Sequence, residues 1–330
     1  MLGEFDMIDR LLRPLARGHA GAFDLSDDAA LIQDREGRGL VVTTDTMVEG
    51  THFLPDDPPD SVGRKLVRVN LSDMVAKAAR PVAAFLNLAW PRRRPAAELE
   101  ALVAGLGADL AELCGDVPLM GGDTTATDGP LVLTLTLMGS PVGPRPVLRR
   151  GAAPGDVVCV TGTIGDAGLG LAVLSQGLVL EAPEGPVAAY RTPQPPPLAF
   201  TQTLARYARA GLDVSDGLLA DLGHLARASG VAVVLELDQI PLSQAAHDWL
   251  TGQADPLAGA VWLAGRGDDY QTVLACRPTD WPALQAAAAD LGLPLTRIGA
   301  CRGGDGVIPR WSGEPVRIDP AAMGWRHSLG

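Results

Sequence analysis

The feature that most constrains this chain is a short apolar run followed directly by side chains that carry oxygen atoms, and it recurs several times. The clearest example is the segment 40–46, where Leu-Val-Val is followed by Thr43, Thr44 and Asp45. The apolar residues predict a short buried strand that ends at these side chains. Hydroxyl and carboxylate oxygens at a strand end suit a hard cation such as Mg²⁺. We therefore expect such carboxylates to meet around Mg²⁺ and nucleotide phosphates.

Length and composition indicate a folded chain of two domains. The chain has 330 residues, of which 47% are hydrophobic and 20% charged, and single cores rarely grow beyond ~250–300 residues. A Pro- and Gly-rich stretch at 142–146 marks a plausible boundary. We expect an N-terminal domain over residues 1–147 and a C-terminal domain over residues 148–330.

Charge and segment patterns exclude several classes of protein. The net charge of -12 argues against a general nucleic-acid surface, and no apolar run approaches the ~20 residues of a membrane span. The acidic N-terminus lacks the form of a signal peptide. The four cysteines are scattered without a C-x-x-C pair, which indicates reduced thiols and a cytoplasmic protein.

The positive charge is almost entirely arginine, which limits how the chain could hold phosphates. Lys65 and Lys77 are the only lysines, and no G-x-x-x-x-G-K-[ST] segment supplies a P-loop lysine. An acidic phosphate site must then neutralise its ligand with metal ions, and carboxylates must hold those ions.

Three further loop segments contain Asp residues, and in each segment these residues could have a purely structural role. The Asp-Asp pair at 27–28 could be a simple turn or helix cap. Asp216 could be the N-cap of a helix. The Gly-Gly-Asp segment at 121–123 either lets the backbone approach a ligand closely or forms a tight turn before the strand expected at 131–137.

Helical periodicity predicts helices over residues 4–17 and 61–79. Inside the second lies Asn-Leu-Ser-Asp at 70–73. Asn, Ser and Asp favour caps and local backbone bonds over helix interiors. This segment therefore indicates either a break between two helices or a functional excursion, and we favour the second.

Nine segments, taken together, resemble the thiamine-monophosphate kinase family, whose superfamily includes aminoimidazole ribonucleotide synthetase. Each segment alone is weak, whereas their ordered conjunction is specific. They occur in the family's order and extend to about residue 325, so the similarity covers essentially the whole chain. The segments are 3–5, 27–30, 43–46, 50–53, 70–73, 121–125, 160–166, 213–217 and 267–270.

The resemblance implies a kinase that uses ATP and several Mg²⁺ ions to convert thiamine monophosphate to thiamine diphosphate. It implies an α/β (α+β) fold with an N-terminal mixed sheet flanked by helices and a C-terminal α/β domain. The N-terminal domains would pair in a homodimer whose sheets form a shared barrel, with nucleotide in the adjoining cleft. The partners would be ATP and thiamine monophosphate, without nucleic acid or membrane.

Carried over position by position, the resemblance implies a role for each matched side chain. The Mg²⁺ ligands would be Asp28, Thr43, Thr44, Asp45, Asp73, Asp123, Asp213 and Asp216. Among them, the residues most directly involved in catalysis would be Asp45, Asp73, Asp123 and Asp213. The nucleotide phosphates would contact Gly122, Asp123, Arg149 and Ser215. The thiamine substrate would contact His52, Asp268 and Trp325.

The chain departs from the family pattern at two places. Ser26 stands where a Gly is common, and the segment 266–271 reads Arg-Gly-Asp-Asp-Tyr-Gln in place of Gly-Gly-Glu-Asp-Tyr-Glu. Asp268 keeps the negative charge of the family's Glu but is one methylene shorter. Its contact with the cationic thiamine could therefore be lost or mediated by water.

The acceptor implied by the resemblance is an ionised phosphate, so no strong general base is required. At ~4 Å two unit charges repel by about 4 kcal/mol at an effective dielectric near 20, which Mg²⁺ bridging both phosphates would offset. We expect direct transfer with no phosphoenzyme. The alternatives are another ATP user of the superfamily (aminoimidazole ribonucleotide synthetase-like or hydrogenase-maturation-like), a metal-dependent phosphohydrolase and a silent ligand-binding regulator.

Overall fold

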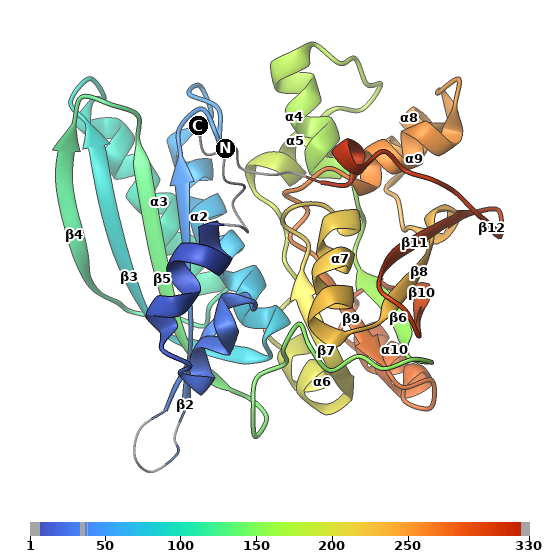
Figure 1. The fold of residues 1–330 in the computed structure, drawn as a ribbon. Coiled ribbons are helices and arrows are strands. Elements are labelled where there is room, and N and C mark those ends of the chain that lie inside the picture. The colour runs from blue at the N-terminus through green and yellow to red at the C-terminus, as the bar shows by residue number, and fades with distance from the viewer. Residues whose placement is uncertain (1–6, 34–36, 38, 325–330) are drawn as a thin grey trace.

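The computed structural model describes residues 7–33, 37 and 39–324, and its strands form two sheets (Figure 1). The first sheet has the order β1-β2-β5-β3-β4, and only its β3–β4 pair is parallel. Its mixed strands confirm the expected fold class. The strands are β1 (Ala30–Gln33), β2 (Gly39–Val48), β3 (Ala79–Pro91), β4 (Leu119–Thr127) and β5 (Val132–Pro141).

Two helices, α2 (Pro59–Ala76) and α3 (Ala96–Glu112), pack against each other beside this sheet. Their backbones approach closely because glycines meet at the crossing: a Cβ on Gly63 would lie 2.1 Å from the carbonyl oxygen of Leu102. The helix α2 also contacts β7 and β9 of the second sheet. It is therefore buried along most of its length, between the two sheets (Figure 1).

The second sheet has the order β12-β11-β8-β10-β6-β9-β7 and is covered by helices (Figure 1). Its apolar strand residues form a core with α7. The strands are β6 (Val157–Thr161), β7 (Ala208–Asp213), β8 (Ala232–Glu236), β9 (Thr272–Cys276), β10 (Leu295–Arg302), β11 (Gly306–Trp311) and β12 (Glu314–Pro315). The helices are α4 (Asp166–Gln176), α5 (Glu184–Arg191), α6 (Phe200–Tyr207), α7 (Leu218–Ser229), α8 (Gln244–Thr251), α9 (Pro256–Ala264) and α10 (Trp281–Asp290).

No helix among the described residues is both long and apolar enough to cross a membrane. Short helical turns complete the fold: η1 (Ile8–Leu12), η2 (Arg13–Ala16), η3 (Ala20–Leu25), η4 (Leu237–Gln239) and η5 (Pro320–Ala322).

The single helix expected over residues 4–17 is wrong for the part that the structure describes. That part is a π turn followed by a 3₁₀ turn, η1 and η2. Pro14 cannot donate a backbone N–H and its ring disfavours a continuous α-helix. Arg17 then adopts a left-handed conformation with φ 52° and ends the run. The family-like segment 3–5 lies outside the described residues.

Three local expectations also need correction. The strand β2 does not end at Asp45 but continues to Val48, because β5 pairs with it as far as Val132. The helix α2 runs unbroken through 70–73, where the Asn70 amide nitrogen donates to the Leu66 carbonyl at 2.9 Å. The segment 121–123 is not a turn but the middle of β4.

Candidate active site

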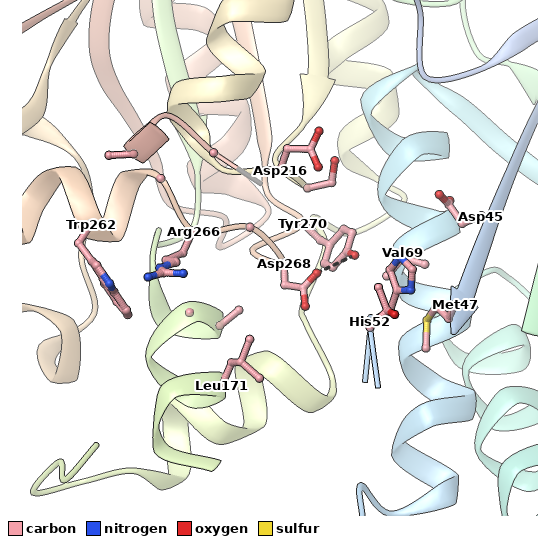
Figure 2. A pocket seen from close by; sticks show the side chains of 18 of the residues that line it. Asp45, Met47, His52, Val69, Leu171, Asp216, Trp262, Arg266, Asp268 and Tyr270 are labelled. Atoms are coloured by element: carbon pink, nitrogen blue, oxygen red, sulfur yellow. Dashed lines mark hydrogen bonds between the residues drawn. The ribbon is translucent and has the colours of Figure 1, made fainter. Parts of the chain in front are cut away.

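A cleft of about 740 Å³ opens between the first sheet with α2 and the loops of the second sheet (Figure 2). The predicted residues that line it are Asp45, His52, Ser215, Asp216 and Asp268. A further wall is the segment 319–324, where a Cβ on Gly265 would lie 2.2 Å from the carbonyl oxygen of Ala322. Residues far apart in the sequence thus share one cavity.

Next to Asp45, three carboxylates from three different elements converge. One oxygen from each of Asp28, Asp73 and Asp213 lies within 4.8 Å of the others. Asp73 lies on α2, Asp213 ends β7, and Asp28 precedes β1. The Asp45 carboxyl shares a hydrogen bond with Asp73 and so joins the cluster. Four predicted metal ligands therefore meet in one place.

Hydroxyl groups orient these carboxylates. The Thr43 hydroxyl donates to the Asp73 carboxylate, and the Ser72 hydroxyl donates to Asp213 Oδ2 at 2.9 Å. Thr43 faces α2 because side chains alternate along β2. The polar residues of the segment 70–73 thus act through their side chains while the helix stays intact.

Two cations hold the Asp-Asp pair at 27–28. Lys77 Nζ lies 2.7 Å from Asp27 Oδ1 and 2.5 Å from Asp28 Oδ2. Arg149 Nε donates to Asp28 Oδ1 at 2.5 Å, and its backbone N–H donates to Asp27 Oδ2 at 2.9 Å. Arg149, which sequence reasoning assigned to the nucleotide phosphates, is paired with Asp28 in this structure.

The cluster carries more negative charge than its own cations neutralise. Burial raises the pKa of Asp45 to about 6 and that of Asp213 to about 8. Burial and then repulsion from Asp213 raise the pKa of Asp73 well above its usual value. For Asp28, burial also acts upward, but Arg149 and Lys77 outweigh it and hold the pKa below its usual range. Oxygen ligands with excess negative charge fit a hard divalent cation.

The candidate substrate residues His52 and Asp268 line the same cleft as Asp45, with His52 on the same side of it as Asp45 (Figure 2). His52 Nδ1 accepts a hydrogen bond from the Val48 N–H at 3.1 Å. Asp268 Oδ2 pairs with Lys65 Nζ at 2.7 Å, and Asp268 Oδ1 accepts from the Tyr270 hydroxyl at 3.1 Å. The shorter Asp side chain is therefore already engaged by two protein groups.

Ser215 and Asp216 lie in the loop between β7 and α7. The Ser215 carbonyl accepts from the Asp268 N–H at 2.9 Å and so ties the two cleft loops together. Asp216 lies beside Asp221 and His224, each with one potential ligand atom within 4.8 Å of the others. The N-cap of α7 is Gly217, so the alternative that Asp216 is that cap is wrong.

Three predicted residues lie away from the cluster, and a fourth cannot be placed. Asp123 and Gly122 lie on β4, which is separated from β2 by β5 and β3; three strand spacings amount to about 14 Å. The Thr44 side chain faces the outer side of the sheet, where its hydroxyl lies 2.9 Å from that of Thr136. Trp325 lies outside the described residues.

Sequence reasoning missed Lys65 and Lys77 as site residues. Both lie on or just after α2, where a buried cation looks like an ordinary helix surface charge in one sequence. The available signal was their rarity, since they are the only lysines in the chain. Asp221, whose pKa burial raises well above its usual value, was also missed.

Comparisons with known proteins identify the class. Residues 26–140 match the family AIR synthase related protein, N-terminal domain, and residues 153–312 match AIR synthase related protein, C-terminal domain. The chain is therefore an AIR synthase related protein. The thiamine-monophosphate kinase of Caulobacter vibrioides is 44% identical over 98% of this chain and 90% of that protein. The chain belongs to the thiamine-monophosphate kinase family.

Solved structures agree with this assignment. A structure of AaThiL complexed with AMPPCP and TMP aligns with a TM-score of 0.83 at 29% identity, covering 99% of this chain and 97% of that one. The thiamine-monophosphate kinase of Stenotrophomonas maltophilia aligns with a TM-score of 0.75 at 38% identity, covering 96% and 98%.

Proposed function

We propose that this chain transfers the γ-phosphate of ATP to thiamine monophosphate, giving thiamine diphosphate and ADP. The observation that carries the proposal is the convergence of Asp28, Asp73 and Asp213 within 4.8 Å beside a cleft that also holds His52 and Asp268. The near full-length similarity to thiamine-monophosphate kinases names the substrates. The four cysteines are free and buried, in keeping with a reducing cytoplasm, where we place the enzyme.

The donor set fits Mg²⁺. The ligands would be the four converging carboxylates with Thr43, all of them oxygen donors, and Asp216 would serve a neighbouring ion. When bound, Mg²⁺ supplies positive charge that offsets the repulsion between the phosphates and stabilises the transition state. Burial is the main cause of the raised pKa values of Asp45, Asp73 and Asp213, and a bound cation would offset it.

The chain's own residues supply alignment. Ser72 and Thr43 fix the rotamers of Asp213 and Asp73. Lys77 and Arg149 hold Asp28 as an anion. The acceptor phosphate is ionised at neutral pH, so no side chain needs to remove a proton, and transfer proceeds directly without a phosphoenzyme.

We further propose a homodimer that pairs through the first sheet. Its strand β4 is an edge strand that is exposed along nearly its whole length and, within the described part of the chain, pairs only with β3. Unpaired edges favour pairing with another chain. Exposed apolar side chains gather on β1, β3 and β4: Ile32, Val82, Phe85, Leu119 and Met120. Asp123 is too far from Asp45 to share an ion within one chain, so the partner would supply it.

The direct test is an assay with ATP, Mg²⁺ and thiamine monophosphate that measures thiamine diphosphate and ADP. We expect equimolar products and no phosphate release from a monoester when ATP is omitted. ATP-independent phosphate release would favour the metal-dependent phosphohydrolase instead. Turnover of formylglycinamidine or carbamoyl substrates, but not of thiamine monophosphate, would assign another activity of the superfamily, and binding without turnover would indicate a regulator.

A further inference from the structure

Lys65 is a buried cation that connects the two sides of the cleft. It lies on α2, and its side chain is 2% exposed. Its Nζ lies 2.7 Å from Asp268 Oδ2 and 3.0 Å from the carbonyl oxygen of His52. The face of the Tyr190 ring lies 4.2 Å away and meets the remaining side of the ammonium group. One side chain thus contacts both candidate substrate residues.

Asp268 is held in a strained backbone conformation and in a fixed side-chain orientation. Asp268 has a φ of 70°, in the left-handed region that a non-glycine residue seldom occupies. Its side chain remains 30% exposed and lines the cleft. Tyr270 donates to one of its oxygens (Figure 2) and Lys65 pairs with the other, so the carboxylate has a single orientation.

His52 is also held in place by Lys65, together with a backbone N–H group. The Lys65 contact fixes its carbonyl, and the Val48 N–H fixes Nδ1 of its ring at 3.1 Å. His52 follows β2 of the first sheet, whereas Asp268 precedes β9 of the second. A link between the two sheets therefore runs through one ammonium group on α2.

We propose that Lys65 is a positioning residue for the acceptor substrate, which holds Asp268 and the His52 segment in register across the cleft. The inference rests on the proposed function for the identity of that substrate. It also means that Asp268 meets the cationic ring of thiamine monophosphate as half of an ion pair. Recognition of this ring then depends on the orientation of the Asp268 carboxylate rather than on the net charge of the Asp268–Lys65 pair.

The test replaces Lys65 with methionine, which keeps the length of the side chain and removes the charge. We expect Lys65→Met to raise the KM and Kd for thiamine monophosphate about tenfold, with kcat changed less than about threefold and the KM for ATP unchanged. Arg64→Met is the matched control, because Arg64 precedes Lys65 on α2 but pairs with Asp109 at 2.6 Å, outside the cleft. Values within twofold of wild type in folded Lys65→Met overturn the proposal.

A second arm tests whether Lys65 acts through Asp268. In an Asp268→Asn background, Lys65→Met is expected to change the same KM by less than about threefold, because residues acting as a unit are not additive. A tenfold effect in both backgrounds would show that Lys65 does not act through Asp268. If Lys65→Met fails to fold, Tyr270→Phe removes the other Asp268 hydrogen bond without leaving a buried charge. It should raise the KM about threefold, and an unchanged KM there also overturns the proposal.

Calorimetric binding of thiamine monophosphate keeps the two proposals distinguishable. Binding by the wild type without turnover would refute the proposed kinase, while the Kd comparison would still decide the role of Lys65. Normal wild-type turnover with an unchanged Kd in Lys65→Met would overturn the role of Lys65 alone. A wild type that neither binds nor phosphorylates thiamine monophosphate overturns both.

Discussion

At the scale of single residues, the site consists of carboxylates kept together against their mutual repulsion. Asp73 has its pKa raised by burial and by three neighbouring carboxylates, and Asp28 has its own lowered by two cations. A neutral side chain at position 73 would remove one of the repelling charges. Loss of function and loss of stability should therefore separate at this position.

Asp73→Asn should abolish phosphate transfer while leaving the fold intact. We expect kcat to fall by at least about 100-fold, since removal of one preorganised electrostatic contact commonly costs that much. The melting temperature without Mg²⁺ should stay equal or rise, and its increase on adding Mg²⁺ should shrink. Activity assays and thermal melts would check this, with the exposed Asp305→Asn as control. Near-normal turnover at saturating Mg²⁺ would contradict the assignment of Asp73 as a metal ligand.

The sequence is enough to identify the carboxylates of the site, but not the lysines that pair with carboxylates there. Asp28, Asp45, Asp73 and Asp213 are recognisable because each follows or precedes an apolar run within a family-like segment. Lys65 and Lys77 are not, because neither shows which neighbours it faces. The pairing of Asp268 with Lys65 spans 203 positions, and only the tertiary fold creates it.

At the scale of elements, α2 can be recognised from its sequence pattern, whereas β4 cannot. The periodicity of α2 predicts the helix but places its end at residue 79, whereas α2 ends at Ala76 and Ala79 already begins β3. Its burial between two sheets is not predicted either, because apolar and polar residues are buried alike. The strand β4 contains two adjacent glycines followed by Asp123, so this part of its pattern resembles a turn. Pairing with β3 outweighs that local preference.

The glycine pair in β4 allows a matched test. Gly122 has a φ of 149°, and a Cβ there would lie 1.7 Å from the carbonyl oxygen of Leu86. Gly122→Ala should therefore lower the free energy of unfolding by about 3 kcal/mol. At Gly121 the nearest atom to an added Cβ is 3.7 Å away, in the Phe85 ring, so Gly121→Ala should have little effect. Urea unfolding measures both, and equal losses would contradict the close approach at Gly122.

At the scale of the whole molecule, no described helix or strand of the chain covers the outer face of the first sheet or the edge strand β4 (Figure 1). Asp123 faces this side, in register with Asn87 and Thr134. The helices lie on the other side of the sheet, with the acidic cluster. In the homodimer that we propose, a second copy would bring its own β4, and with it Asp123, to this cleft.

Mixing two inactive variants tests this arrangement. Asp73→Asn and Asp123→Asn should each be inactive alone. After the mixed subunits re-associate at random, about a quarter of the sites would have neither substitution, so about a quarter of wild-type activity should return. Size-exclusion chromatography would establish the dimer. A mixture that forms heterodimers without regaining activity would show that each site uses its own Asp123.

The segment 319–324 has a consequence for anyone altering this protein. It lies last among the described residues, yet it lines the cleft beside Gly265, Asp216 and the start of α7. The Ala322 carbonyl touches Gly265 so closely that a larger residue there would push the segment outward. Truncation from Asp319 onward would open the cavity to solvent on that side, so the segment 319–324 forms part of the wall of the cleft and is unsuitable as a place for deletions or inserted labels.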